Sequence, residues 1–512
     1  MNEKRSIVKV IFSSSLGTMI EWYDFYIFGM LAKTISVQFF PEGNSSTALL
    51  STLAIFAAGF LVRPFGALVF GRLGDMIGRK STFLLTLVLM GGSTFLIGLV
   101  PGYKTIGIAA PLLVLLLRLL QGLALGGEYG GAATYVAEHA PANRRGYYTS
   151  WIQTTATLGL FVALGVILLV KGGMTEEAFT SEWGGWRYPF WLSILLVGVS
   201  IYIRLKMHES PLFSKLKSEG KTSDNPLKES FGKKNNFKMV LLALFGAVMG
   251  QGVIWYTGQF YAQSFLENTV KLEFIQNREI MLWAIGLATP FFLVFGALSD
   301  RVGRKWIMLT GMLLGVIFYR PIFSQLIKDT DIKEWAKTEY SIYNKETKVS
   351  MHKGDSVVHY LTTYEIPDKS RFTRVTTDTI KEGRTVMEGY QQMISATNKA
   401  VYNNIVLSTA LKWKFIFLIW IMIIFVTMVY GPVAAFLVEL FPTKIRYTSM
   451  SLPYHIGNGV FGGLVPFIAT LLATTFTTDP LVGLWYPIGV AALCFIIGAI
   501  YLNNKVDEDV ND

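Results

Sequence analysis

The sequence predicts an all-α membrane protein of twelve transmembrane helices, arranged as two pseudo-symmetric halves of six helices each. Three observations support this fold class. The 512 residues are 52% hydrophobic and only 16% charged, whereas soluble domains carry about 25% charged residues. Apolar blocks follow one another along the chain, and each is close in length to the ~20 residues that a helix needs to cross a bilayer. Two short polar motifs recur at matching places in the two halves.

The apolar blocks give the predicted helices in order. Several are longer than 25 residues, which fits helices that are tilted in the membrane. The first block contains Glu21 and Asp24, and no small-residue cleavage site closes it, so we expect a retained helix rather than a signal peptide. The blocks cover residues 7–31, 48–70, 81–101, 108–137, 147–171, 187–206, 238–266, 280–299, 306–327, 413–438, 448–475 and 481–502.

The distribution of charge predicts how the helices are oriented. The formal net charge is +11. Outside residues 328–412, most Lys and Arg of the polar gaps precede the first block or follow the even-numbered ones. Short cytoplasmic loops retain positive charge, so we expect both termini in the cytoplasm. The basic balance is thus a topology signal, and no nucleic-acid partner is expected. Cys494, the single cysteine, excludes an internal disulfide and indicates no redox compartment.

The halves are related by an internal repeat. Gly71, Asp75, Gly78, Arg79 and Lys80 after the second block recur 225 positions later, as Gly296, Asp300, Gly303, Arg304 and Lys305 after the eighth. Glu138, Pro141 and Arg145 recur 301 positions later, as Glu439, Pro442 and Arg446. The glycines permit a tight turn between helix ends. A single copy would suit a solvated basic turn, whereas two copies in register indicate a duplicated six-helix unit.

The difference between the two displacements predicts an insertion in the second half. We expect a first half over 1–206, a cytoplasmic linker over 207–237, helices seven to nine over 238–327, an extracytoplasmic insertion over 328–411, and helices ten to twelve with the tail over 412–512. Residues 360–364 and 371–376 suggest short strands, and 385–411 suggests a helix. A polar loop of this length is either functional or disordered. We favour a small ordered cap.

The repeated Gly-x-x-x-Asp-x-x-Gly-Arg-Lys loops resemble the signature loop of the major facilitator superfamily. The first block, from Gly17 through Glu21-Trp22-Tyr23-Asp24 to Gly29, resembles one branch, the metabolite:proton symporters, which include permeases for proline and betaine, α-ketoglutarate, shikimate and citrate. The stretches that begin at Arg63, Arg118, Trp183 and Glu439 match this branch as well. The resemblance covers all twelve blocks, and the long insertion departs from it. It implies a secondary transporter of the major facilitator fold, without a cofactor.

Charged residues near the ends of the blocks are the candidate gate. Glu138 with Arg144 or Arg145, and Glu439 with Arg446, are expected to form salt bridges at the cytoplasmic ends. Arg63 precedes a proline and leads into the first repeated loop, so bracing of the gate is favoured over contact with substrate. The candidate gate residues are Arg63, Gly71, Asp75, Gly78, Arg79, Lys80, Glu138, Arg145, Asp300, Gly303, Arg304, Glu439 and Arg446.

Charges within the blocks are the candidate proton-coupling groups, because ionisable residues are costly in lipid and mark transport pathways. Glu21 and Asp24 share a face of the first helix, and Asp24 and Arg118 lie at a similar depth of ~15 Å. We expect an Asp24–Arg118 pair, either a switch whose aspartate takes a proton when the contact weakens or a static link between the two helices, and absence of contact is the third alternative. Gln121 and Glu128 lie on the Arg118 face, and Glu128 either relays protons or braces the gate.

Polar and aromatic residues near the middle of the helices are the candidate substrate site, because transporters of this build bind substrate between their halves. Trp255 suits a quaternary ammonium group, and His455 is either a titrating group or a satisfied structural histidine. For each residue, ordinary packing between helices is the alternative. The candidates are Tyr23, Tyr26, Arg118, Gln121, Tyr129, Gln153, Gln251, Trp255, Tyr256, Gln259, Tyr430, Tyr454, His455 and Asn458.

The sequence therefore predicts proton-coupled symport of a small organic acid, zwitterion or osmolyte across a bacterial inner membrane, by a monomer whose partners are the substrate, the proton and the bilayer. Sodium coupling stays open, because carboxylates serve either ion. A membrane receptor or osmosensor with the same fold is the alternative, since the insertion suits it. The sequence contains no metal-ligand cluster, nucleophile elbow or phosphate-binding loop, so neither an enzyme nor an ATP-driven pump is predicted.

Overall fold

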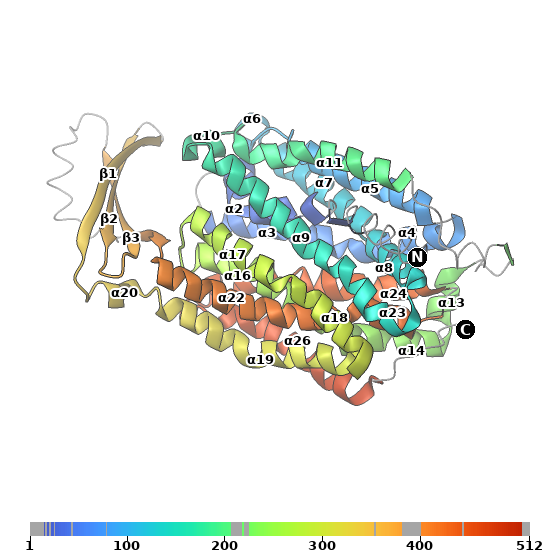
Figure 1. The fold of residues 1–512 in the computed structure, drawn as a ribbon. Helices are drawn as coiled ribbons and strands as arrows, with labels where there is room; N and C mark the ends of the chain where they lie inside the picture. The colour runs from blue at the N-terminus through green and yellow to red at the C-terminus, as the bar shows by residue number, and fades with distance from the viewer. Residues whose placement is uncertain are drawn as a thin grey trace. The chain divides into compact units, whose positions relative to one another are not determined.

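Figure 1 shows the computed structural model of the chain, a set of long helices and a small β-sheet. The structure describes residues 15, 18–19, 22–24, 26–41, 45–77, 79–205, 218–219, 225–352, 355–380, 401–442 and 445–503. Within these ranges, nine helices are long and apolar enough to cross a membrane. They cover Thr47–Leu73, Ala109–His139, Ala142–Gly172, Lys234–Asn268, Phe274–Val302, Arg304–Trp335, Thr409–Leu440, Arg446–Thr475 and Val482–Tyr501.

Further helices occupy the places of the other three predicted spans. In the first half the elements are α2 (Ala32–Phe39), α3 (Ser45–Leu61), α4 (Arg63–Ile77), α5 (Arg79–Ile97), α6 (Tyr103–Ile106), α7 (Ala109–Leu125), α8 (Glu128–His139), η1 (Ala142–Arg144), α9 (Arg145–Gly172), α10 (Glu176–Thr180), η2 (Gly185–Arg187) and α11 (Tyr188–Leu205). Residues 26–30 continue α2 toward the N-terminus. The predicted helical membrane fold is therefore confirmed.

The second half repeats this pattern. Its helices are α13 (Pro226–Gly232), α14 (Lys234–Ala243), η3 (Leu244–Val248), α15 (Met249–Tyr256), η4 (Thr257–Tyr261), α16 (Ala262–Asn268), α17 (Phe274–Ala288), α18 (Pro290–Val302), α19 (Arg304–Lys328), α20 (Ile332–Trp335), α22 (Thr409–Tyr430), α23 (Val433–Leu440), α24 (Arg446–His455), η6 (Ile456–Gly462), α25 (Val465–Thr475), η7 (Val482–Leu484) and α26 (Trp485–Tyr501).

Proline and glycine explain why many spans consist of two helices in series. Pro64 is the second residue of α4, just after the end of α3, and Pro290 is the first residue of α18, just after the end of α17. Gly431 and Pro432 separate α22 from α23. Proline removes a backbone donor and disfavours helical geometry in the residue before it. The spans therefore break at points that the sequence marks.

Packing divides the chain into two compact units. The first contains Met1–Tyr261, Ala284–Arg320 and Trp420–Asp512, and the second contains Ala262–Trp283 and Pro321–Ile419. In the first unit, α3 and α7 cross where Gly59 and Gly122 meet. A Cβ on Gly122 would lie 1.8 Å from the carbonyl oxygen of Gly59. Only glycine allows the two backbones this close, so the sequence fixes the crossing point of these helices.

The second unit contains a four-stranded antiparallel sheet. The strands β1 (Ser341–His352), β2 (Asp355–Glu365), β3 (Arg371–Ile380) and β4 (Val401–Val406) lie in the order of the sequence (Figure 1). Glu365 pairs with Arg371 where β2 turns into β3, and Arg371 Nε donates a 2.7 Å hydrogen bond to its carboxylate. The expected strands in the insertion are present, within longer ones.

The helix expected over 385–411 is wrong for its described part. Residues 381–400 lie outside the described residues, 401–406 form β4, and α22 begins at Thr409. The backbone of Ile405 donates to Lys271 O and accepts from Glu273 N, each at 2.9 Å. Its side chain is 1% exposed. These ladder bonds hold the segment extended, which local helical tendency could not anticipate.

Side-chain hydrogen bonds also attach the sheet to helix ends in the same unit. The Gln276 side chain in α17 bonds both backbone groups of Leu407, with Nε2 donating at 3.0 Å and Oε1 accepting at 2.7 Å. Phe372 on β3 stacks on Tyr364 with 5.3 Å between ring centroids. The described residues of the second unit therefore form an ordered body rather than a linker.

Candidate functional site

Aromatic side chains from both halves meet in the interior of the first unit. Trp22 and Tyr26 lie one helical turn apart, and their rings stack with 5.3 Å between centroids. Trp255 contacts both rings, at 5.6 and 5.9 Å, and Tyr430 at 6.0 Å. All four side chains are buried. We define the central cluster as Trp22, Tyr26, Phe60, Arg63, Trp255, Tyr256 and Tyr430.

Arg63 brings a positive charge into the central cluster. The side chain is 1% exposed, and its guanidinium carbon lies 4.3 Å from the centre of the Phe60 ring and 5.8 Å from that of Trp22. The Phe60 ring in turn contacts the Tyr256 ring, with 5.1 Å between centroids. The sequence assigned Arg63 to the gate. In the structure it lies beside predicted substrate residues, within one turn of the middle of the Thr47–Leu73 helix, and its gate assignment stays a prediction.

Asp24 is buried, and its carboxyl oxygen Oδ1 has no hydrogen-bond partner among the described residues. Its side chain is 1% exposed. Its Oδ2 lies 3.3 Å from the point that a Cβ on Gly91 would occupy, and a Val197 methyl lies 1.9 Å from the same point. The carboxyl group therefore faces α5 near its contact with α11. Tyr23 donates to the carbonyl of Pro189 at 2.9 Å, which ties the same helix to α11.

The predicted ion pair between Asp24 and Arg118 is not formed in this conformation. Arg118 instead donates a hydrogen bond to the side-chain oxygen of Gln121. Gln121 Nε2 donates to Thr94 Oγ1 at 2.7 Å and to the backbone carbonyl of Asp24 at 3.3 Å. The Arg118 guanidinium lies over the Phe28 ring, 4.5 Å from its centre. Gln121 therefore takes the place beside Arg118 that the carboxylate was expected to occupy.

Four predicted substrate residues of the second half have buried polar atoms without a hydrogen-bond partner among the described residues. They are Trp255, through Nε1, Tyr256, through its hydroxyl, Gln259, through both amide atoms, and His455, through both ring nitrogens. Gln251 and Asn458 differ, because their amides bond each other at 3.1 and 2.7 Å. Among the described residues, His455 therefore lacks the hydrogen-bond partners that a satisfied structural histidine would have. Buried polar atoms without partners are uncommon and need an explanation, such as a ligand or water.

The backbone around these groups is π-helical. Gln259 lies in η4, Asn458 lies in η6, and His455 directly precedes η6. Single π-helical turns inside α-helices occur often at functional sites. Sequence reasoning missed these segments, because hydrophobic periodicity does not separate an α-helical turn from a π-helical one.

Four other predicted substrate residues form a connected chain that joins the halves. Gln153 Nε2 donates to the Tyr129 hydroxyl at 2.6 Å. The rings of Tyr129 and Tyr454 stack with 3.5 Å between centroids and 3° between planes. The hydroxyls of Tyr454 and Tyr430 lie 2.7 Å apart. Tyr129 belongs to α8 and Tyr454 to α24, so the stack closes the contact between these two helices.

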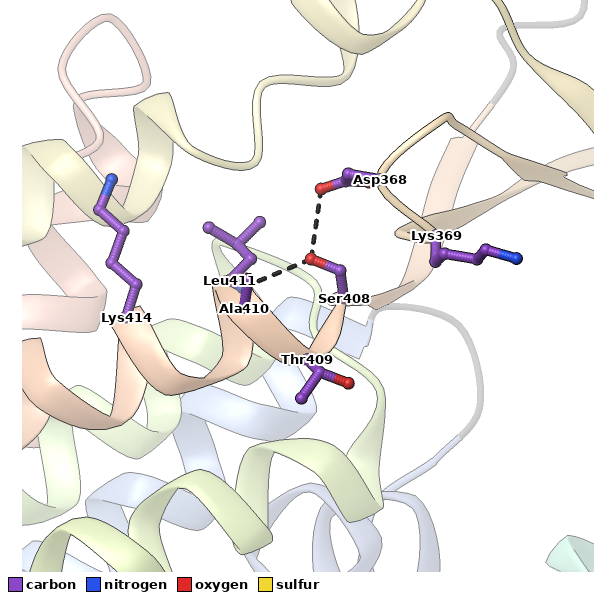
Figure 2. Close-up of a pocket in the computed structure, with 7 residues that line it drawn as sticks. All are labelled: Asp368, Lys369, Ser408, Thr409, Ala410, Leu411 and Lys414. Atoms are coloured by element: carbon purple, nitrogen blue, oxygen red, sulfur yellow. Dashed lines mark hydrogen bonds between the residues drawn. The ribbon is translucent and has the colours of Figure 1, made fainter.

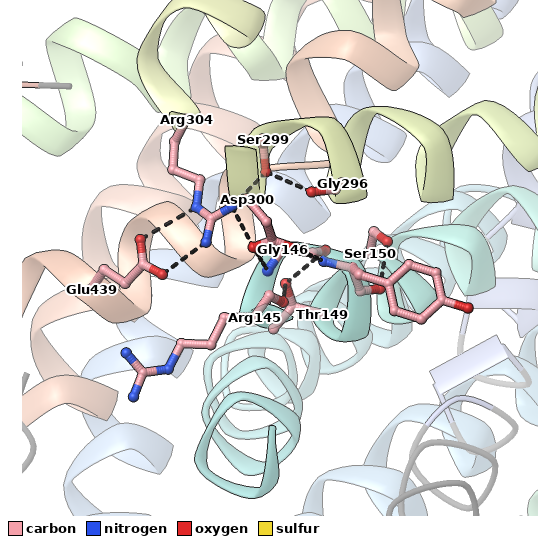
Figure 3. Close-up of polar contacts among 10 residues, drawn as sticks. Arg145, Gly146, Thr149, Ser150, Gly296, Ser299, Asp300, Arg304 and Glu439 are labelled. Carbon is pink, nitrogen blue, oxygen red and sulfur yellow. Dashed lines mark hydrogen bonds and ion pairs between the residues drawn. The ribbon is translucent and has the colours of Figure 1, made fainter. Parts of the chain in front are cut away.

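The second repeated loop makes the main polar contact between the halves (Figure 3). Asp300 in α18 accepts hydrogen bonds from the backbone N–H of Gly146 at 2.8 Å and of Tyr147 at 2.9 Å. A carboxylate at the N-terminus of α9 meets free backbone donors and the positive end of the helix dipole. Arg304 holds Asp300 at 2.7 Å and Glu439 at 2.9 Å. All three side chains are largely buried.

A second ion pair joins the halves at a neighbouring point. Arg446 of α24 lies 3.7 Å from Glu138 of α8. The predicted pairs within each half, Glu138 with Arg144 or Arg145 and Glu439 with Arg446, are not formed among the described residues. Glu138 pairs across the interface instead, because α8 and α24 pack against each other. Glu439 pairs with Arg304 of its own half. The gate assignment of these residues stays a prediction.

The other residues of the repeated loops have structural roles where they are described. Gly303 ends α18 with φ of 92°, a backbone conformation that favours glycine. Lys305 donates to the carbonyls of Ala499 and Leu502 and so caps α26, a contact that the sequence did not suggest. Gly71 lies against Tyr447 of α24. Glu21 and Gly78 lie outside the described residues, as do the side chains of Asp75, Arg79, Lys80 and Glu128.

A pocket of about 500 Å³ lies in the second unit, at the start of α22 (Figure 2). Ser408 caps the helix by accepting from the backbone N–H of Leu411 at 3.4 Å, and it donates to Asp368 at 3.3 Å. Lys369 and Lys414 line the opening, and Lys414 pairs with Asp329 at 2.6 Å. These polar groups already bond each other, so we assign no ligand to this pocket.

Comparison with known proteins identifies the family of this chain. The model of a family described as "sugar (and other) transporter" matches residues 10–338. The chain belongs to this family. The inner membrane metabolite transport protein YhjE of Escherichia coli is 32% identical over 473 residues, which cover 91% of this chain and 88% of that protein. The protein is therefore a multi-pass membrane transporter of the major facilitator superfamily and a relative of the metabolite symporters.

Relatives with a named substrate match shorter stretches. The α-ketoglutarate permease of Escherichia coli is 38% identical over 64% of this chain and 73% of its own length. The proline/betaine transporter of Salmonella typhimurium is 36% identical over 59% of this chain and 61% of its own length. The crystal structure of a D-xylose–proton symporter superposes with a TM-score of 0.63 at 14% identity, covering 98% of this chain and 99% of that one. This structural likeness confirms the predicted fold. At 14% identity it does not identify the substrate of this chain.

Proposed function

We propose that this transporter couples proton entry to uptake of a small polar metabolite, an organic acid, zwitterion or osmolyte, across a bacterial inner membrane. The observation that carries the proposal is the buried Asp24 carboxyl, which has no polar partner in the described structure and lies one glutamine away from Arg118. Relatives of this chain include an α-ketoglutarate permease and proline/betaine transporters.

Burial explains how Asp24 carries a proton. An ionised carboxylate without a partner is costly in a dry interior, so the neutral acid is the expected form in this conformation. Proximity to an arginine favours the ionised form. A movement that withdraws Gln121 and brings Arg118 to Asp24 therefore releases the proton. Direct pairing and proton release then belong to the opposite conformation of the transport cycle.

The second half supplies the groups that recognise the solute. Trp255, Gln259 and His455 are buried without hydrogen-bond partners in the described structure. Leaving such groups unpaired costs about 1–3 kcal/mol each. A solute that supplies donors and acceptors removes this cost, and its binding energy then favours the closed conformation. The halves thus have separate tasks, with proton coupling in the first and solute recognition in the second.

Proton coupling predicts that an inward proton gradient drives accumulation of the transported solute in liposomes. The purified protein is reconstituted, an inward proton gradient is imposed, and uptake of labelled α-ketoglutarate, citrate, shikimate, proline and glycine betaine is measured. We expect at least one solute to accumulate with the gradient and to stop when a protonophore is added. Accumulation that follows a sodium gradient at equal pH inside and outside would contradict proton coupling.

A receptor or osmosensor is the alternative, and the ordered sheet of the second unit favours it. Under this alternative, a solute of the panel raises the melting temperature of the protein without accumulating in the liposomes.

Both termini are proposed to be cytoplasmic, because the basic gaps lie on their side of the membrane. A protease applied from outside to intact cells should then leave tags on either terminus uncut.

A further inference from the structure

We infer that Gly91 and Arg187 are positioning residues for Asp24, because they set how closely α5 and α11 approach each other where the Asp24 carboxyl lies. The inference rests on the proposed proton coupling and goes beyond it by naming what holds the coupling group in place. Gly91 lies in the contact between the two helices, and Arg187 lies at its end. Both helices belong to the first half.

Glycines on one face of α5 let α11 pack directly against the backbone of α5. A Cβ on Gly91 would lie 1.9 Å from a methyl carbon of Val197 in α11. Two turns further along, a Cβ on Gly98 would lie 2.8 Å from the Cβ of Phe190. Gly91 and Gly98 are seven residues apart and therefore share a face of the helix. A side chain at either point would clash with α11, so the two glycines set the spacing of the helices.

Arg187 fixes the same two helices to each other at the end of α5. Its side chain is buried, and its Nη1 donates to the backbone carbonyls of Gly98 at 2.7 Å and of Val100 at 2.8 Å. Trp191 Nε1 also donates to the Gly98 carbonyl, at 3.0 Å. Gly98 directly follows α5, where backbone carbonyls lack partners within the helix and a cation is favoured. Arg187 thus clamps the start of α11 to the end of α5.

The Asp24 carboxyl lies in this contact between α5 and α11. Its Oδ2 is 3.3 Å from the point that a Cβ on Gly91 would occupy, and the side chain is buried. The neighbouring Tyr23 donates to the carbonyl of Pro189 at 2.9 Å, two residues from Arg187. The helix of Asp24 is therefore tied to α11, while its carboxyl faces the backbone of α5.

This placement matters for coupling because it holds the carboxyl apart from Arg118, whose guanidinium bonds Gln121 instead. A carboxyl that keeps its place meets Arg118 only when the helices move. A carboxyl that loses its place can take or release a proton without that movement, and proton entry is then no longer linked to solute entry. The fit of α5 against α11 should therefore affect coupling more than movement of the solute itself.

Two neighbouring glycines of α5 give a matched pair of variants. Gly91→Ala places a methyl group against Val197 and Asp24, whereas a Cβ on Gly92 would meet no atom within 4 Å. Liposomes are assayed for accumulation of the labelled solutes named above under an inward proton gradient, and for exchange of the same solutes at equal pH. We expect Gly91→Ala to lower the ratio of accumulation to exchange about 10-fold or more. Gly92→Ala should keep the wild-type ratio.

Further variants separate positioning from folding. Val197→Ala, added to Gly91→Ala, removes the clashing methyl group, so we expect both the melting temperature and the ratio of accumulation to exchange to recover. Arg187→Gln removes the cation that clamps the two helices and should lower the ratio as Gly91→Ala does. Arg187→Lys keeps a cationic donor and should lower it less. This last pair carries the comparison if Gly91→Ala does not fold.

A purely structural role gives a different pattern, in which Gly91→Ala lowers accumulation and exchange in equal proportion per folded protein. That pattern would overturn the inference, and so would a wild-type ratio in Gly91→Ala. Failure of the proposed function looks different. The wild type itself then accumulates no solute with the proton gradient, while Val197→Ala still restores the melting temperature of Gly91→Ala.

Discussion

Charged groups at two places in the first unit differ in how fully they are paired. Where the second repeated loop meets α9, Asp300, Arg304 and Glu439 satisfy one another and the end of a helix. In the interior, Arg118 lies against an aromatic ring and a glutamine, and Asp24 has no polar partner in the described structure. The first arrangement holds two halves together. The second leaves a group ready to change its protonation or its partner.

The difference between paired and unpaired charges indicates how each set of groups affects the stability of this conformation. A fully paired contact stabilises one conformation and must be broken once in each cycle. A buried group without a partner destabilises the same conformation until a proton or a solute arrives. Paired charges should therefore control how often the halves separate, and the interior groups should control what passes between them.

The buried pair of Arg304 and Glu439 should show the largest effect on stability. Glu439→Gln removes the charge that faces Arg304, and breaking one side of a buried pair costs about 3–5 kcal/mol. We expect a lower melting temperature and more frequent opening of the contact between α9 and α18. Replacing both residues, as Arg304→Met with Glu439→Leu, should recover part of the loss. Equal loss in the single and double variants, measured by thermal unfolding, would show that the pair is not coupled.

The stacked tyrosines should show an intermediate effect. Tyr454→Phe keeps the stack on Tyr129 and loses only the hydroxyl contact with Tyr430, which costs about 1 kcal/mol. Tyr454→Ala also removes the ring and should open the contact between α8 and α24 further. Opening is measured by reaction of Asn458→Cys with a membrane-impermeant maleimide, in a protein that lacks Cys494.

The order of labelling rates decides the role of the stack. We expect Tyr454→Ala to label fastest, then Tyr454→Phe, then the unaltered tyrosine. Tyr148→Ala removes a half-buried ring that contacts Tyr147 in the same helix, and it should not change the rate. If Tyr148→Ala labels as fast as Tyr454→Ala, loss of the stack is not what opens the interior.

The ion pair of Arg320 and Asp479 should show the smallest effect. Its groups lie 2.7 Å apart but are more than a third exposed, and exposed pairs contribute less than about 1 kcal/mol. The hydrogen bond from Arg320 lowers the pKa of Asp479, which lies between α25 and η7. The contribution should therefore be present above the ordinary carboxyl pKa of about 4 and be lost as pH falls through the lowered value. A difference between the melting temperatures of Asp479→Asn and the wild type that grows as pH falls would contradict this sign.

The sequence predicted the fold well because the bilayer imposes a simple rule on each helix. Apolar length located the spans, and the 225-residue repeat located the two halves. Composition also indicated the strands near residues 360 and 371, but β4 depends on backbone bonds to Lys271 and Glu273. Contacts between distant segments leave no mark on local periodicity.

The site was predicted less completely, for a physical reason that Asp24 illustrates. Depth along a helix placed Asp24 and Arg118 at one level, but depth does not say what lies between two side chains. Gln121, one turn from Arg118 on the same helix, fills that space. Likewise, the sequence did not show that the Arg63 guanidinium lies against the rings of Phe60 and Trp22. Side-chain partners follow from packing, which one sequence does not specify.

The central claim, that Asp24 links proton movement to solute movement, is tested by comparing two modes of transport in one preparation. Liposomes with wild-type or Asp24→Asn protein are assayed for gradient-driven accumulation and for exchange of labelled against unlabelled solute at equal pH. The neutral amide resembles the protonated acid, so we predict that the variant keeps exchange and loses accumulation. Accumulation at the wild-type level in Asp24→Asn would contradict the claim.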